Sequence, residues 1–260
     1  GSARHRSSLN RRWTFLFLLA PLVVLGPVVG HDFVFDDQDF LVHGEVLHHV
    51  SGLVRGFTEP YWRIAGVEAA QPYYRPLGVS AFSALWLLGG GHPWSFHLAS
   101  LLLHGACAAA LARLALRFGA TPTVATIAGL LFALHPAQVQ TVAWSTCLTE
   151  LACTGCVLGA LLAWSRRRSL ALGIWLLTAL LFKETAIAGA LVLVLAETLG
   201  ARSRRIYFAM GLACVIALAL RFLALGWPGA IAGVQPAETL SGLSAKPGVL
   251  DLASWHGQQL

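Results

Sequence analysis

The 260-residue chain is 57% apolar, and only 12% of its residues are charged. Soluble domains carry about 25% charged residues, so this composition excludes an ordinary soluble protein and predicts an integral membrane protein with several spans. The net charge of +6 lies in short basic clusters between apolar runs, without a basic stripe interleaved with aromatic residues, which excludes nucleic acid as a partner.

Clusters of arginine predict how the chain crosses the bilayer. The positive-inside rule places such clusters in the cytoplasm, and the first cluster precedes the first apolar run, so we expect a cytoplasmic N-terminus. All clusters lie on that side only if one apolar run, residues 77–88, does not cross; with about 12 residues it suits an interfacial or re-entrant helix. The four clusters are Arg4, Arg6, Arg11 and Arg12; Arg113 and Arg117; Arg166, Arg167 and Arg168; and Arg202, Arg204 and Arg205.

The predicted fold is therefore all-α, a polytopic bundle of transmembrane helices with about seven spans. We expect the spans at about 13–30, 94–118, 122–136, 146–165, 169–183, 185–200 and 206–224. A long first external loop, 31–93, is expected to hold juxtamembrane helices, and a further external segment follows at 225–260. We expect residues 1–260 to be the amino-terminal part of a longer transmembrane domain whose later spans are missing here.

The first candidate site follows the first span, where residues 33–37 read Phe-Val-Phe-Asp-Asp. Asp36 and Asp37 are adjacent carboxylates in a zone of partly low dielectric, so at least one of them is expected to need a cation, a hydrogen-bond donor or a proton. Such a group is suited to act as a general base or to approach a metal ion. The alternative is a solvated loop start in which the aspartates cap a helix.

The next candidates lie in the two external loops. Arg75 precedes Pro76 at the start of the predicted interfacial helix, where it can pair with an acid or a lipid phosphate, or can anchor the loop together with the tyrosines beside it. His135 and Glu150 fall in the second external loop. Glu150 also gains from the dipole of the helix that it begins, which is a purely structural alternative.

The last candidates lie near the ends of later spans. Lys183 and Glu184 are adjacent in a tight external turn, as a structural ion pair or as a phosphate site. Arg221, near the external end of the last span, is a guanidinium in apolar surroundings, which calls for a carboxylate or a phosphate.

Taken in order, these segments resemble the GT-C superfamily of membrane glycosyltransferases, and in particular the protein O-mannosyltransferase-like family with transmembrane and tetratricopeptide-repeat parts. The resemblance extends over about residues 30–226. The matching pieces are FVFDD at 33–37, YRPL at 74–77, His-Pro at 92–93, Phe-His at 96–97, His104, FALHP at 132–136, VAW at 142–144, Glu150, FKE at 182–184 and RFLALG at 221–226.

The resemblance implies transfer of a sugar, such as mannose, from a polyprenyl-phosphate carrier in the bilayer to a protein or glycan hydroxyl on the non-cytoplasmic face, with inversion. It implies a catalytic base at Asp36 or Asp37 and a second-loop acid at Glu150. A divalent cation, Mg²⁺ or Mn²⁺, is the one cofactor that we consider, with Asp37 and Glu150 as its ligands. Candidates to bind the donor phosphate or the acceptor are Arg75, His135, Lys183, Glu184 and Arg221.

Two departures from the family pattern bear on that expectation. The chain has Gln138-Val139-Gln140 where relatives read His-Thr-Glu, and Leu148 stands where relatives have a basic residue before the second-loop acid. These changes leave the choice of acceptor and the use of a metal open.

The alternative function is a non-enzymatic transporter or flippase of lipid-linked sugars, which would place charges at mid-bilayer beside a pathway. A structural scaffold is a third option. The charges gather at one face of this chain instead, which favours chemistry at the membrane surface. Because the chain is rich in Arg and Ala, we expect the bacterial inner membrane, with a periplasmic active face, in preference to the ER membrane with a lumenal one.

Overall fold

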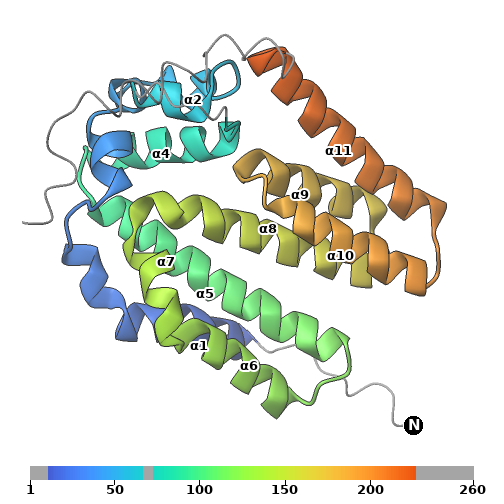
Figure 1. Ribbon diagram of the computed structural model, residues 1–260. Coiled ribbons are helices and arrows are strands. Elements are labelled where there is room, and N and C mark those ends of the chain that lie inside the picture. Colours follow the sequence, from blue (N-terminus) through green and yellow to red (C-terminus); the bar gives the residue numbers. More distant parts are fainter. Residues whose placement is uncertain (1–10, 67–72, 227–260) are drawn as a thin grey trace, which may run out of the picture. The chain divides into compact units, whose positions relative to one another are not determined.

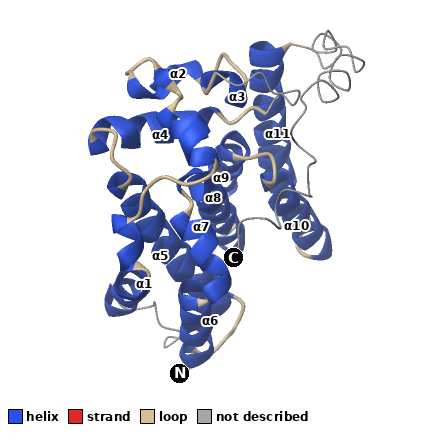
Figure 2. Ribbon diagram, turned by 60° about the vertical axis from the view of Figure 1, so that its left-hand side comes forward, coloured by secondary structure: helices blue, strands red, loops and turns tan. Residues whose placement is uncertain are grey.

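The computed structural model describes residues 11–66 and 73–226. Within these ranges the chain forms helices and no strand (Figure 2). The all-α prediction is therefore confirmed. The predicted external segment 225–260 lies outside the described residues except for its first two positions.

Each of the seven ranges predicted as spans coincides largely with one helix of at least 13 residues (Figure 1). Clear helix ends explain this agreement: Pro122 lies in the first turn of its helix, and the side chain of Thr121 caps it by accepting the N–H of Val124. The helices are α1 (Arg11–Val24), α5 (Trp94–Arg117), α6 (Pro122–Leu134), α8 (Leu148–Ser165), α9 (Ser169–Phe182), α10 (Ala186–Leu199) and α11 (Arg204–Leu225).

The count of seven spans is not confirmed. Among the described residues, only Trp94–Arg117, Ser145–Ser165 and Arg204–Leu225 are long and apolar enough to cross a bilayer, and Pro122–Leu134 with Pro136–Ala143 would make a fourth span bent by 48°. Helices α9 and α10 have 14 residues each, which rise about 21 Å against a hydrocarbon core of about 30 Å. Both helices agree with the predicted ranges 169–183 and 185–200 to within one residue at each end, and the extended backbone of Lys183 (φ −159°, ψ 140°) ends α9.

The first loop, predicted at 31–93, is a chain of short helices that packs on the bundle. It contains η2 (Gln38–Val42), a single π-helical turn, then η3 (Glu45–His48), α2 (Gly52–Arg55), α3 (Tyr61–Ile64) and α4 (Pro76–Gly89). Helix α4 begins at Pro76 and ends before Gly90, whose left-handed φ of +62° allows the chain to turn. With 14 residues α4 is too short to span, as predicted, and its interfacial position stays a prediction.

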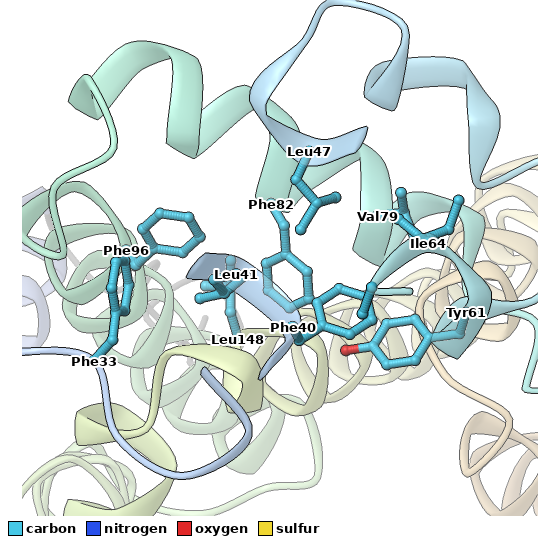
Figure 3. Close-up of a cluster of buried hydrophobic side chains, with 11 residues drawn as sticks. Phe33, Phe40, Leu41, Leu47, Tyr61, Ile64, Val79, Phe82, Phe96 and Leu148 are labelled. Carbon is cyan, nitrogen blue, oxygen red and sulfur yellow. The ribbon is translucent and has the colours of Figure 1, made fainter. Parts of the chain in front are cut away.

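A buried aromatic and aliphatic cluster holds this loop in place. Phe40, Leu47 and Phe82 are fully buried, and Leu148 at the start of α8 joins them (Figure 3). The ring of Phe40 stacks on Tyr61 with a centroid distance of 4.0 Å. Burial of a large side chain of this kind stabilises a fold by about 1.5–3 kcal/mol. The cluster therefore holds the first loop in a fixed position against the start of α8.

At the other end of the bundle, a buried carboxylate joins the turn between α8 and α9 to the turn between α10 and α11. Glu197 of α10 is fully buried and accepts hydrogen bonds from Arg167 (2.6 and 2.8 Å), from the Trp164 indole (2.7 Å) and from the backbone N–H of Ser203 (2.5 Å). One carboxylate thus ties the α8–α9 turn to the α10–α11 turn. The arginine clusters meet at this end, since Arg117 also donates to the carbonyl of Ser165 (2.9 Å), in agreement with their common predicted side.

Candidate active site at the loop end of the bundle

Asp37 joins the first external loop to the second. Its side chain is fully buried, and its two carboxylate oxygens accept the backbone N–H groups of Thr146 (2.8 Å), Ser145 (3.1 Å) and Val34 (3.4 Å). Ser145 and Thr146 belong to η5 (Ser145–Cys147), the turn that leads directly into α8. The acidic motif of the first loop is therefore tied to the turn that precedes α8, the helix whose first turn carries Glu150.

Burial and hydrogen bonding act on Asp37 in opposite directions. Burial raises its pKa, and the N–H groups of Thr146, Ser145 and Val34 lower it; burial is the larger effect, so the pKa lies above the ordinary value of 3.8. All three partners are donors, so they hold the carboxylate in one orientation. This geometry suits a residue that positions its neighbours.

Asp36, the adjacent residue, is exposed. Phe35 before it has a left-handed φ of +51°, a conformation that a bulky residue rarely adopts, and its ring lies 5.7 Å from that of Trp144. Strained backbone of this kind often occurs at functional sites. Here the strained turn directs Asp37 inward and leaves Asp36 open to a substrate.

Arg75 is held by an acid and two aromatic rings. Its guanidinium donates to both carboxylate oxygens of Glu184 (3.0 and 2.5 Å) and lies 5.1 Å from the ring centroid of Tyr61 and 4.7 Å from that of Tyr73. A bidentate Arg–carboxylate pair with cation–π support has a fixed orientation. The alternative of a lipid anchor for Arg75 is therefore not needed to explain its place.

Lys183 forms the second ion pair of the region, with Glu150 of α8. Lys183 and Glu184 are neighbours in the turn between α9 and α10, so one turn supplies a cation to the second loop and an acid to the first. The Lys183 and Arg75 side chains are mostly buried, with 15% and 13% exposed, whereas Glu150 and Glu184 are 41% and 46% exposed. The acids face outward and the cations lie beneath them.

The hydroxyl of Tyr61 lies close enough to Arg75, Asp36 and Asp37 for the charges of all three to act on its pKa. Burial raises the pKa of its hydroxyl, the positive charge of Arg75 lowers it, and the negative charges of Asp36 and Asp37 raise it again; the net pKa lies well above the ordinary value of 10. The structure therefore brings together six of the predicted residues from four segments of the chain. They are Asp36, Asp37, Arg75, Glu150, Lys183 and Glu184.

A pocket of about 410 Å³ opens beside the Glu150 carboxylate. Its lining includes Gln138, Gln140, Thr141 and Thr154, together with Cys147 at the end of η5. Amide and hydroxyl groups can donate and accept hydrogen bonds without carrying charge. The pocket therefore suits a neutral polar ligand, and it contains the two glutamines at which this chain departs from the family pattern.

Two predicted site residues, His135 and Arg221, do not take part in the ion pairs and hydrogen bonds described above. His135 is exposed, and its Nδ1 accepts the N–H of Ala137, so it caps the short helix η4 (Pro136–Gln138). Arg221 lies toward the C-terminal end of α11, and its assignment to the donor phosphate stays a prediction.

The residues considered as metal ligands have other partners in this arrangement, and the use of a divalent cation stays a prediction. Both oxygens of Asp37 already accept backbone N–H groups, and Glu150 is paired with Lys183. Within residues 11–66 and 73–226, no three His, Cys, Asp or Glu side chains form a group that could hold a metal ion.

Sequence reasoning missed the partners that orient these groups. Tyr61 gave no signal because a tyrosine in a loop predicted at the membrane surface is expected on headgroup grounds alone. The N–H groups of Ser145 and Thr146 gave none because every residue except proline has one. Only the fold shows which backbone groups meet Asp37.

The Arg75–Glu184 pair predicts a loss of stability in acid. Burial acts to raise the pKa of Glu184, but the hydrogen bonds and charge of Arg75 outweigh burial and hold it below 4.5. A carboxyl whose folded-state pKa is depressed stabilises the fold above its unfolded-state pKa, and this contribution is lost as the pH falls through the folded-state value. We expect the melting temperature of the wild type to exceed that of Glu184→Gln at about pH 6, and we expect this difference to shrink as the pH falls below 4.5. A difference that does not change with pH would contradict this origin.

The amino-acid sequence of the chain is similar to those of several proteins that are named as transferases. The chain is 32% identical over 210 residues to "Protein O-mannosyl-transferase Tmtc2" of Drosophila melanogaster, which covers 75% of the chain and 22% of that relative. It is 33% identical over 175 residues to "Protein O-mannosyl-transferase Tmtc1" of the same fly, with 64% and 20% covered, and 29% identical over 137 residues to human "Protein O-mannosyl-transferase TMTC3", with 52% and 15% covered. No protein-family model and no solved structure matches the chain.

These relatives correct the predicted location. They are animal proteins, so the expectation of a bacterial inner membrane is wrong. The abundance of Arg and Ala on which it depended follows from apolar helices and their flanking basic turns, which membrane proteins of any organism share.

The chain spans about a fifth of the length of the curated relatives it matches. The resemblance predicted from the sequence is nevertheless confirmed: over 75% of its length, this chain is homologous to the TMTC protein O-mannosyl-transferases.

Proposed function

We propose that this chain is part of a membrane glycosyltransferase that moves mannose from a polyprenyl-phosphate carrier to a hydroxyl of a protein or glycan at the non-cytoplasmic face. The names of the relatives supply the sugar and the protein acceptor. The observation that carries the proposal is the convergence of acids and cations from four distant segments at one end of the bundle. In an animal cell we place this face in the lumen of the ER.

In the proposed reaction, Asp36 is the general base, because it is exposed and held beside a fixed neighbour. The acceptor oxygen forms a bond to C1 of the mannose, the bond from C1 to the phosphate oxygen breaks, and the hydroxyl proton passes to the Asp36 carboxylate. A base on the face opposite the leaving group is what an inverting displacement requires. Asp37 then acts as a positioning residue that fixes the turn from which Asp36 projects.

Lys183 and Arg75 are suited to the leaving phosphate. Both are cations in mostly buried positions at the membrane surface, where charge stabilisation is stronger than in water. In the described structure their charges are balanced by Glu150 and Glu184. A phosphate bound beside them would compete for the same donors, so donor binding and ion-pair rearrangement are coupled in this proposal.

The polar pocket beside Glu150 is proposed for the acceptor. Its glutamine and threonine side chains suit a peptide backbone or a sugar hydroxyl. The alternative function, a transporter or flippase, would require ionisable side chains along a path between the helices. The ion pairs of the described helices lie at helix ends instead.

The test is a transfer assay on membranes that contain the protein. Radiolabelled polyprenyl-phosphate mannose and a Ser/Thr-rich peptide are supplied, and label on the peptide is counted. We expect transfer from the lipid-linked donor and none from nucleotide-linked mannose. No transfer from any mannose donor, with the protein folded, would contradict the enzymatic function.

Replacing Lys183 with glutamine is expected to weaken donor binding selectively. The variant keeps a polar side chain of similar length but loses the positive charge that faces the phosphate. We expect KM for the lipid-linked donor to rise about tenfold, equivalent to about 1.4 kcal/mol, with KM for the peptide unchanged. An equal rise of both KM values would mean that Lys183 only supports the fold through Glu150.

A further inference from the structure

An apolar groove runs between α9 and α11, at the other end of the bundle from Lys183 and Glu184. It has a volume of about 570 Å³ and is lined almost entirely by apolar side chains. Leu170, Ile174 and Phe208 in this lining are 77%, 57% and 70% exposed. On a candidate membrane span such as α11, apolar side chains exposed in this way face the acyl chains of the bilayer.

One end of the groove is strongly cationic. Arg204 and Arg205 line it, together with Ser169, the first residue of α9, and both helices begin here without an acidic residue in the first turn. Within the described part of the chain, neither guanidinium has an ion-pair or hydrogen-bond partner. Arg167 nearby shows the contrast, since it is fully engaged by Glu197.

The chemistry at this end favours an anion. A helix N-terminus carries unsatisfied N–H groups and the positive end of the helix dipole, and no side chain caps α9. Two arginines beside such an N-terminus are suited to a phosphate, which they bind with charge-assisted hydrogen bonds.

The length of the groove matches one leaflet of the bilayer. Its lining on α11 extends from Arg204 to Ile216, which is a rise of about 18 Å. Half of the hydrocarbon core is about 15 Å thick. The arginine clusters mark the cytoplasmic side, and the cytoplasmic leaflet carries the anionic lipids.

We propose that this groove binds an anionic phospholipid of the cytoplasmic leaflet. One acyl chain lies between α9 and α11, and the headgroup phosphate contacts Arg204, Arg205 and the N-terminal N–H groups of α9. The site is independent of sugar transfer, because it lies at the opposite end of α9 from the residues assigned to catalysis.

The test measures lipid selectivity by electron paramagnetic resonance. The whole chain is placed in phosphatidylcholine nanodiscs with spin-labelled phosphatidic acid or spin-labelled phosphatidylcholine. We expect a motionally restricted component that favours phosphatidic acid about tenfold or more. In Arg204→Ala/Arg205→Ala this preference is expected to disappear. The matched control Arg166→Ala/Arg202→Ala removes the same charge from the same end outside the groove and is expected to keep it.

A second variant tests the groove itself. Leu212 lines the groove and is 46% exposed, so Leu212→Trp fills the hollow without disturbing a buried position. We expect it to reduce the restricted component for both lipids. The proposal is overturned if the control pair loses selectivity as much as Arg204→Ala/Arg205→Ala does. It is also overturned if the wild type shows no restricted phosphatidic acid, as when a second copy or another helix fills the groove.

Discussion

Asp36→Asn is expected to lower the rate of mannose transfer by about 10²- to 10⁴-fold, the usual contribution of a general base. Asparagine keeps the size of the side chain but cannot accept the proton of the acceptor hydroxyl. Asp36 is exposed and makes no side-chain hydrogen bond with the described residues, so the melting temperature is expected to stay within about 1 °C of the wild type. The measurement is kcat at saturating donor, in the transfer assay described above.

Asp39→Asn provides the matched control. Asp39 lies three residues further along the same loop, is 69% exposed, and has only a loose contact with His43 at 3.9 Å. The same chemical change there is expected to leave transfer unaffected. If the two variants lose activity equally, the loss reflects the charge of the loop, and Asp36 is not the base.

Asp37→Ala is expected to lower the free energy of unfolding by about 3 kcal/mol or more. The change leaves the buried N–H of Ser145 and the part-buried N–H of Thr146 without an acceptor. Hydrogen bonds to a charged group contribute about 1.5–3 kcal/mol each. Burial of the carboxylate, which is the larger influence on the pKa of Asp37 and raises it, opposes this stabilisation in the wild type. The loss in Asp37→Ala is expected because each N–H group left without an acceptor costs about 1–3 kcal/mol. Activity is expected to fall with it, because the turn that presents Asp36 is no longer fixed.

Hydrogen exchange identifies the mechanism of that loss. In the wild type the amides of Ser145 and Thr146 are expected to exchange slowly, and in Asp37→Ala they are expected to exchange much faster than amides in the centre of α8. Asp37→Asn keeps one acceptor oxygen and is expected to fall between the two. Unchanged protection of both amides in Asp37→Ala would contradict a structural role for the Asp37 contact.

The helical part of the fold could be predicted because its signals are local. Apolar runs bounded by arginines and prolines predicted where each long helix lies, and the arginine clusters predicted which helix ends share a side. The same signals predicted seven spans, a count that is not confirmed, since α9 and α10 lie where they were predicted but have only 14 residues each.

The candidate site was predicted in its residue types but not in its pairing. Charged groups at a membrane surface are conspicuous in an apolar sequence, so Asp36, Arg75 and Glu184 could be identified from the chain alone. The sequence suggested that Lys183 and Glu184 pair with each other. In the structure each pairs with another segment instead, because adjacent side chains in this turn point to different neighbours.

The difference between Asp36 and Asp37 could not be predicted for a similar reason. Adjacent acids look equivalent in a sequence, and only the left-handed conformation at Phe35 and the N–H groups of a distant turn separate a buried carboxylate from an exposed one. Position in the fold, and not residue type, decides which of them is suited to take a proton.

Photo-crosslinking tests the location of the site most directly. Phe35 is 78% exposed beside Asp36, and Phe118, at the C-terminal end of α5, is 64% exposed near the arginine clusters. Each is replaced in turn by p-benzoyl-phenylalanine and irradiated with radiolabelled polyprenyl-phosphate mannose. We expect label at position 35, competed by unlabelled donor, and none at position 118. Label at position 118 alone, or equal label at both positions that the unlabelled donor does not compete, would contradict a donor site at the loop end of the bundle.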